Sequence, residues 1–193
     1  MISNQSINNQ LYSFINFVEL DKLEVELIHN ERNHIDVRFS MFDPSPITFE
    51  QHCKFLNLLK FDRSKIYFLV KRKNEYVGVY SLVNIAGSEA QSGFYLLENA
   101  RIKNIAIEFL YYTISFVFSK LSISTINGFA LKENKVANRI NTLFKFKDST
   151  PSKSTDLYNY SELYKHTWES EVVNNINILK LMSHTEKLFQ NEI

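Results

Sequence analysis

The distribution of apolar and polar residues along this chain of 193 residues predicts two kinds of element. Short apolar segments bounded by turn residues predict strands near residues 14–18, 66–70, 76–85, 91–97, 123–131 and 156–168, and a further strand should begin at residues 144–147. Apolar residues that recur every three or four positions predict helices after residue 21, after residue 48, and over residues 103–121, 135–144 and 171–189. The order β-α-α-β-β-β-α-β-α-β-α predicts an α/β fold in which a mixed sheet carries helices on both faces.

The first two helices carry start signals. Asp21 is followed three residues later by Glu24, and Thr48 by Gln51, so both pairs match the capping box. The first helix should end near residues 29–33. The apolar faces are expected at Leu23, Leu27 and Ile28 in the first helix, and at Phe49, Cys53, Leu56 and Leu59 in the second.

The chain is long enough for one domain with a core of its own. We expect a disordered N-terminus over residues 1–10, a single domain over residues 11–170 and a C-terminal helix over residues 171–193. The apolar stripe of that last helix is expected at Val172, Ile176, Leu179 and Met182. This stripe either packs on the domain or forms the contact of a homodimer.

Composition and charge exclude several classes of function. The 22 Lys and Arg residues balance 21 Asp and Glu residues, so the chain lacks the basic footprint of a nucleic-acid-binding protein. His29 and His34 are not in the spacing of a zinc-binding H-E-x-x-H motif, and no metal is expected. The 16 Phe and 10 Tyr residues indicate a core rich in aromatic rings.

Several features bear on the compartment. Cys53 is the single cysteine, which fits a reducing compartment. The N-terminus has no basic start followed by an apolar run, so no signal peptide is expected. The longest apolar stretch, residues 109–118, is far shorter than the roughly 20 residues that span a bilayer. We therefore expect a cytoplasmic protein without a membrane span.

The segment from Glu31 to Ile85 contains an Arg-Asn-His loop, a helix with a histidine and a two-strand hairpin, in that order. This succession resembles the start of a GCN5-related N-acetyltransferase (GNAT), a family with a mostly antiparallel central sheet. It is most similar to the branch that acetylates nucleotide-linked amino sugars in pseudaminic acid biosynthesis. The resemblance covers about residues 14–168.

The cofactor loop of that family has the pattern Arg/Gln-x-x-Gly-x-Gly/Ala before a helix. The matching stretch here is Arg101-Ile102-Lys103-Asn104-Ile105-Ala106. The resemblance implies that Arg101, Lys103, Asn104, Ile105 and Ala106 bind the pyrophosphate of acetyl-CoA, chiefly through backbone N–H groups. Asn104 replaces the first glycine, and asparagine is one of the few residues that tolerate a left-handed conformation.

A second landmark of the family begins at Asn134 and continues through Ala137 to Phe146. The resemblance implies that Asn134 caps a helix and contacts coenzyme A. The family tyrosine that protonates the leaving thiolate falls at Asn141, and an amide cannot act as a general acid. Tyr112, Tyr158 and Tyr160 are conceivable substitutes, so the catalytic residue is unknown at this point.

In the sugar-nucleotide branch, the resemblance places Arg32, His52 and Tyr95 at the substrate. Arg32 would bind a phosphate or sugar oxygen through its guanidinium group. The implied activity is transfer of an acetyl group from acetyl-CoA to the amino group of a nucleotide-linked amino-deoxy sugar, for surface glycan or flagellin glycosylation. Two alternatives stay open: a protein-amine acetyltransferase, and a catalytically inactive GNAT-like binding protein.

Overall fold

The computed structural model describes residues 11–41, 43–148 and 153–190. They form two compact units: the first ends at Ser81 and adds Phe94–Ile102, and the second comprises Leu82–Gly93 and the residues from Lys103 onward. The disorder expected for residues 1–10 lies outside the described residues. The boundary expected at residue 170 stays a prediction.

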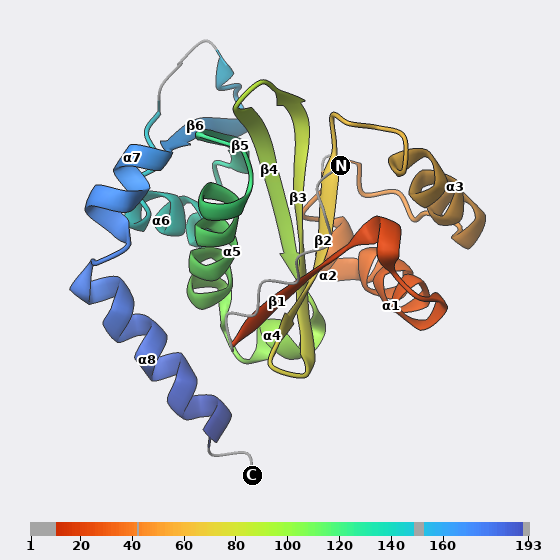
Figure 1. Cartoon of the computed structure of the whole chain (residues 1–193), viewed down its shortest axis with the longest axis horizontal. Coiled ribbons are helices and arrows are strands. Elements are labelled where there is room, and N and C mark those ends of the chain that lie inside the picture. The colour runs from red at the N-terminus through yellow and green to blue at the C-terminus, as the bar shows by residue number, and fades with distance from the viewer. Residues whose placement is uncertain (1–10, 42, 149–152, 191–193) are drawn as a thin grey trace. The chain divides into compact units, whose positions relative to one another are not determined.

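Six strands form one sheet in the order β1-β2-β3-β4-β5-β6 (Figure 1). Their bounds are β1 Tyr12–Asn16, β2 Ile66–Arg72, β3 Glu75–Ala86, β4 Glu89–Leu96, β5 Thr125–Leu131 and β6 Tyr158–Tyr164. β1 pairs antiparallel with β2 and β5 with β6, whereas β4 and β5 are parallel. The α/β class and the mixed, mostly antiparallel sheet are thus confirmed.

The two hairpins depend on residues with a left-handed backbone. Lys73 has φ 51° in the turn between β2 and β3, and Gly87 has φ 60° in the turn between β3 and β4. Such residues are what two-residue hairpin turns require, and these turns make the joined strands antiparallel. β3 and β4 each contribute residues to both units.

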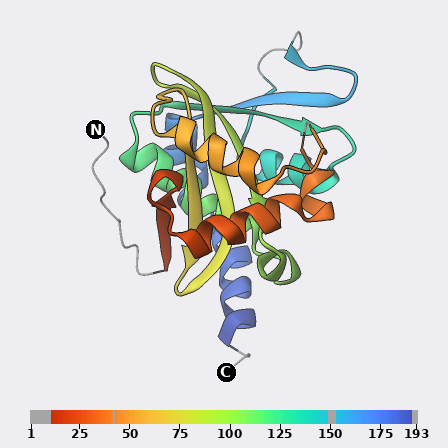
Figure 2. The same cartoon turned by 90° about the vertical axis from the view of Figure 1, so that its right-hand side faces the viewer.

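The helices of the first unit cover its strands. Their bounds are η1 Phe17–Glu19, α1 Lys22–Asn33, α2 Ile35–Arg38, α3 Phe49–Leu59 and α4 Glu98–Ile102. Figure 2 shows α1 and α3, in orange tones, crossing in front of the yellow strands β2 and β3. The core between them contains Phe17, Ile28, Leu56, Leu59, Leu69 and Val79.

Both predicted capping boxes are confirmed. The Asp21 side chain accepts the Glu24 N–H at 2.8 Å, and the Glu24 carboxylate accepts the Asp21 N–H at 3.0 Å. Thr48 and Gln51 repeat this exchange at the start of α3, at 3.1 and 2.7 Å. The helix starts are therefore local properties of the sequence.

Some expected positions in the first unit were wrong. β1 begins at Tyr12, and a 3-10 helix replaces its expected end because Asn16 accepts the Val18 N–H. Leu23 is 75% exposed, and Phe49, in the first turn of α3, is 41% exposed. His52 is buried instead, since it shares the inward face of α3 with Leu56 and Leu59.

The second unit is organised around Trp168. Its helices are α5 Ala106–Lys120, α6 Lys135–Leu143, α7 Lys165–Thr167, the π-helix η3 Trp168–Val172 and α8 Ile176–Gln190. The Trp168 ring lies 5.5 Å from Tyr111, 6.3 Å from Phe118 and 5.4 Å from Phe144, measured between ring centroids. Trp168 thereby joins α5, the end of α6 and η3.

Three elements of the second unit differ from the expectation. β6 is shorter than residues 156–168, and the strand expected at 144–147 is a single bridge from Lys147 to Glu162. The last helix starts at Ile176, because residues 173–175 form a turn that interrupts the helix expected from residue 171. Val172, Ile178 and Met182 are buried, whereas Ile176 and Leu179 are exposed. Whether that exposed side contacts a second copy stays a prediction.

Candidate active site

Arg32 lies in the last turn of α1, where a cation is favourable because the helix dipole is negative there. Its Nη2 donates to the backbone carbonyl of Asp43 at 3.2 Å. Its Nη1 is buried and has no hydrogen-bond partner among the described residues. A buried charged donor without an acceptor is costly, and it marks a place where a ligand could supply one.

His52 projects from α3 into the interior and is 5% exposed. Its ring lies 5.6 Å from that of His29 and 6.4 Å from that of Phe55. Burial, and secondarily the charge of His29, lower the pKa of His52 to about 4. The imidazole is therefore neutral at pH 7, and its Nε2 also has no partner in the described part of the chain.

Tyr95, near the end of β4, packs against the core of the first unit. Burial raises the pKa of its phenol, Arg32 lowers that pKa and Glu31 raises it. The charges at the end of α1 thus act directly on Tyr95, which stays protonated. Tyr95 also interacts with Tyr67, whose ring is 5.1 Å from Phe55.

The structure therefore brings the three predicted substrate residues into the same unit. Arg32 and Tyr95 lie within electrostatic reach of each other. His52 is connected to Tyr95 through the rings of Phe55 and Tyr67. A cation, a neutral imidazole and a phenol among aromatic rings can bind an anionic ligand with hydroxyl groups.

The loop before α5 keeps a sharp turn despite the loss of its glycine. Asn104 adopts a left-handed backbone with φ 54°, and Ile105 is fully buried. Because of this turn, the helix expected from residue 103 begins at Ala106, after the separate short helix α4. No side chain in the described part of the chain caps the start of α5, so the backbone N–H groups of its first turn have no capping residue there.

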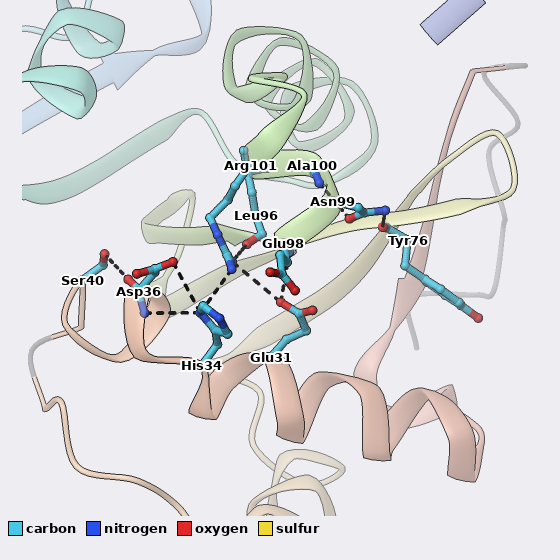
Figure 3. A network of polar contacts seen from close by, with 10 residues as sticks. All are labelled: Glu31, His34, Asp36, Ser40, Tyr76, Leu96, Glu98, Asn99, Ala100 and Arg101. Atoms are coloured by element: carbon cyan, nitrogen blue, oxygen red, sulfur yellow. Dashed lines mark hydrogen bonds and ion pairs between the residues drawn. The ribbon is translucent and has the colours of Figure 1, made fainter. Parts of the chain in front are cut away.

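The side chain of Arg101 is engaged inside the first unit. Its guanidinium contacts the Leu96 carbonyl, Glu31 and His34 (Figure 3). Sequence reasoning missed Glu31 and His34 as its partners, because no local pattern indicates a contact between segments so distant in the chain. The predicted role of Arg101 in cofactor binding stays a prediction.

Asn134 caps α6 by accepting the Ala137 N–H at 3.0 Å, as predicted. Further along the helix, Asn138 binds Asn159 of β6 at 3.0 Å, and Asn141 donates to the Ser161 hydroxyl at 3.4 Å. α6 therefore packs on the face of β6 that carries Asn159 and Ser161.

The three conceivable substitutes for the missing family tyrosine lie on two elements, β6 and α5. Tyr158 and Tyr160 lie on the opposite face of β6, because side chains alternate along a strand. The Tyr160 hydroxyl donates to Glu162 at 2.7 Å. Tyr112 of α5 packs edge-on against Tyr111. Within the described part of β6, no phenol shares the face of Asn141.

β4 pairs with β5 over a short stretch. The registered pairs join Glu89 to Thr125, Ala90 to Ile126 and Gln91 to Asn127. These pairs place the start of β4 beside the start of β5 within the second unit.

Comparison with known proteins places the chain in a family. It is 34% identical over 125 residues to the acetyltransferase PseH of Campylobacter jejuni subsp. jejuni serotype O:23/36 (strain 81-176). The aligned residues make up 65% of this chain and 78% of that protein. The chain belongs to the PseH acetyltransferases. These are GNAT N-acetyltransferases, so the predicted family and the predicted enzyme class are confirmed. No protein-family model matches the chain.

Solved structures agree with this membership. The crystal structure of the C. jejuni N-acetyltransferase PseH in complex with acetyl coenzyme A superposes with a TM-score of 0.65 at 27% identity, over 80% of this chain and 99% of the other. A spermidine N-acetyltransferase from Vibrio cholerae, in complex with CoA and spermine, has a TM-score of 0.71 at 15% identity, over 83% and 99%. The second likeness concerns the fold alone.

The described residues lack a metal-binding cluster and a membrane-spanning helix. They contain no group of three or more His, Cys, Asp or Glu that could hold a metal ion. None of the helices in the described ranges is both long and apolar enough to cross a membrane.

Proposed function

We propose that this PseH-family enzyme transfers an acetyl group from acetyl-CoA to the amino group of a nucleotide-linked amino-deoxy sugar. The product would serve surface glycan synthesis or flagellin glycosylation, and we place the reaction in the cytoplasm. Membership in the PseH acetyltransferases supports the reaction, and the acetyl-coenzyme A complex of the C. jejuni relative supports the donor.

The observation that carries the acceptor is that two buried nitrogens of the first unit, Arg32 Nη1 and His52 Nε2, have no hydrogen-bond partner among the described residues. Leaving such a group without a partner costs about 1–3 kcal/mol. A phosphate oxygen would match the guanidinium of Arg32, and a hydroxyl or base atom would match the neutral imidazole. Tyr95 would place its phenol beside the same ligand.

The second unit supplies the proposed donor site. The uncapped N-terminus of α5, with Ala106 and Ile105 after the Asn104 turn, would offer backbone N–H groups to the pyrophosphate of acetyl-CoA. Lys103 would add a positive charge to this loop, and Asn134 would contact the pantetheine. The family resemblance implies in addition that the backbone of β4 pairs with the pantetheine arm and polarises the thioester carbonyl.

The proposed chemistry is direct transfer. The acceptor nitrogen attacks the thioester carbon, the carbon–sulfur bond breaks, and a water molecule or weak base takes the ammonium proton. Asn141 can donate a hydrogen bond to the departing thiolate, but its amide cannot protonate it. A thiol is acidic enough to leave as the thiolate, with a pKa of about 8.5.

Cationic acceptors fit the first unit less well. A polyamine or a peptide amine is recognised by acidic groups, whereas the two groups assigned to the acceptor here are a guanidinium and a neutral imidazole. An inactive homologue would need neither a ligand for Arg32 nor an open start of α5.

A thiol-release assay separates these classes. Acetyl-CoA and the protein are mixed with a nucleotide-linked amino sugar, with spermidine, with a peptide bearing a free N-terminus, or with no amine. The proposal expects release with the amino sugar only. Thiol release with the peptide or with spermidine, but not with the amino sugar, would reassign the acceptor. If no amine causes release and calorimetry detects no acetyl-CoA binding, the result would support the inactive homologue.

A further inference from the structure

The side chain of Arg101 is held by three groups of the first unit. Its Nη1 donates to the Leu96 carbonyl at 2.6 Å and lies 3.7 Å from Glu31 Oε2, and its Nη2 is 3.3 Å from His34 Nδ1 (Figure 3). We call these four residues the Arg101 cluster. The side chains of Arg101 and Glu31 are 25% and 17% exposed, so their ion pair is screened less than one on the open surface.

Glu31 connects further segments of the same unit. Its Oε2 also accepts the Glu98 N–H at 3.2 Å, where α4 begins. Next to it, the Leu97 N–H donates to the Val77 carbonyl at 3.0 Å, and Asn99 donates to the Tyr76 carbonyl at 3.2 Å. The cluster thus connects the end of α1, the end of β4 and the start of α4. Hydrogen bonds from Leu97 and Asn99 to β3 hold the chain between β4 and α4 in place.

His34 sits at the junction of α1 and α2 and completes the cluster. Its Nδ1 accepts the Asp36 N–H at 3.4 Å and faces Arg101 Nη2, and the Asp36 carboxylate lies 3.6 Å away. In the tautomer with its proton on Nε2, the ring accepts from both donors through Nδ1. The helix junction is therefore fixed by the same guanidinium that binds the end of β4.

Both ends of the cluster adjoin residues of the proposed acceptor site. Arg32 directly follows Glu31 in α1, and Tyr95 directly precedes Leu96 in β4. The charges of Arg32 and Glu31 both act on the Tyr95 phenol. A shift of α1 along β4 would therefore displace Arg32 relative to Tyr95.

We infer that Arg101 is a positioning residue that fixes α1 against the end of β4, and that it does not act as a ligand of the acetyl-CoA pyrophosphate. The positive charge of Arg101 is paired with Glu31. Its guanidinium N–H groups point at the Leu96 carbonyl and at the His34 ring, both in the first unit. Lys103, two residues later, remains the cationic side chain of the loop proposed for the phosphate. This inference rests on the proposed acceptor site at Arg32 and Tyr95.

A double-mutant cycle with Arg101→Gln and Glu31→Gln tests the inference. Each variant is expected to raise KM for the acceptor about tenfold and to change the Kd of acetyl-CoA less than about twofold, because small displacements of a binding group have large kinetic effects. The double variant should be no worse than either single variant, since both break the same contact. Arg101→Lys keeps the charge without the fork and should recover part of the loss.

Lys103→Gln is the contrasting variant. It should weaken acetyl-CoA binding and leave KM for the acceptor close to that of the wild type. A tenfold rise in the Kd of acetyl-CoA with Arg101→Gln but not with Glu31→Gln would make Arg101 a phosphate ligand and overturn the inference. Additive effects of the two substitutions, or no effect of either, would overturn it as well.

The cycle is run with whichever amine the wild type acetylates, so a wrong assignment of the acceptor is detected separately. Should Arg101→Gln fail to fold, Arg101→Lys and Glu31→Asp complete the cycle. Melting temperatures are recorded for every variant. A loss of activity that is fully accounted for by unfolding at the assay temperature would count against a positioning role.

Discussion

The two compact units differ in whether the polar side chains with a proposed role have hydrogen-bond partners. In the first unit, Arg32 and His52 each have a buried nitrogen without a hydrogen-bond partner in the described ranges. In the second, the α6 residues Asn134, Asn138 and Asn141 all have partners, at the helix start or on β6. Under the proposed function, the first unit would bind the acceptor with side chains, whereas the second would bind the donor chiefly with backbone groups. Acceptor recognition would then depend on side-chain identity, and donor binding on backbone conformation.

Removing the half-buried Arg32 cation gives the largest expected effect. Arg32→Gln should lower kcat/KM for the acceptor about a hundredfold, or about 3 kcal/mol, because a buried charge-assisted contact to an anion is lost. Arg32→Lys should keep only part of the activity. The measurement is initial-rate kinetics at saturating acetyl-CoA.

The exposed Arg63 provides the matched control, since Arg63→Gln removes the same charge outside the proposed site. An equal loss in both variants would reduce the role of Arg32 to net charge. Unchanged kinetics in Arg32→Gln would remove Arg32 from the acceptor site.

The second effect concerns stability against pH. The pKa of His52 is about 4 in the folded protein and about 6.5 when unfolded, so the unfolded chain takes up the proton first as the pH falls. Stability is therefore lost as the pH falls from about 6.5 towards 4. The wild type should lose about 2 kcal/mol more than His52→Gln between pH 7 and pH 5.

Urea unfolding at the two pH values measures this difference in the free energy of unfolding. Comparing the two proteins cancels the titration of the carboxylates that they share. Parallel losses would mean that the imidazole is not buried in its neutral form.

The third effect concerns the backbone of the second unit. Asn104→Val places a β-branched residue at a left-handed position, which costs about 1–2 kcal/mol, and should raise the Kd of acetyl-CoA about tenfold. Asn104→Gly allows the same turn and should bind as tightly as the wild type. Calorimetric titration measures both, and equal Kd values for all three proteins would refute the role of the turn.

The smallest effect is expected at Asn141. Asn141→Tyr introduces the family's acid, and should raise kcat by about threefold, because the thiolate already leaves readily. Asn141→Phe has the same ring without the hydroxyl and should not gain activity. A gain in both variants would point to packing, and a gain in neither would show that thiolate departure does not limit the rate.

Local signals in the sequence were reliable guides to the fold. The capping boxes at Asp21 and Thr48 lie where predicted, because their hydrogen bonds join residues three apart. The hairpins follow from turn residues such as Gly87. The expected helix from residue 103 was wrong, since the left-handed turn at Asn104 depends on the packing of the buried Ile105 as well as on the asparagine itself.

Long-range features were beyond such reasoning. His52 and Cys53 are neighbours on α3, and only the packing against the strands shows that His52 belongs to the inward face. The apolar stripe of α8 differs from the expected one because the turn at residues 173–175 separates α8 from the π-helix. The partners of Arg101 lie on another helix, and no spacing in the sequence indicates them.

The most direct test of the account is the ratio of kcat/KM for a nucleotide-linked amino sugar to kcat/KM for the same sugar without the nucleotide. The thiol-release assay is run on the wild type and on Arg32→Gln. The account predicts a strong preference of the wild type for the linked sugar, and loss of most of that preference in Arg32→Gln. Equal rates with both sugars in the wild type would contradict recognition of the nucleotide by the buried groups of the first unit.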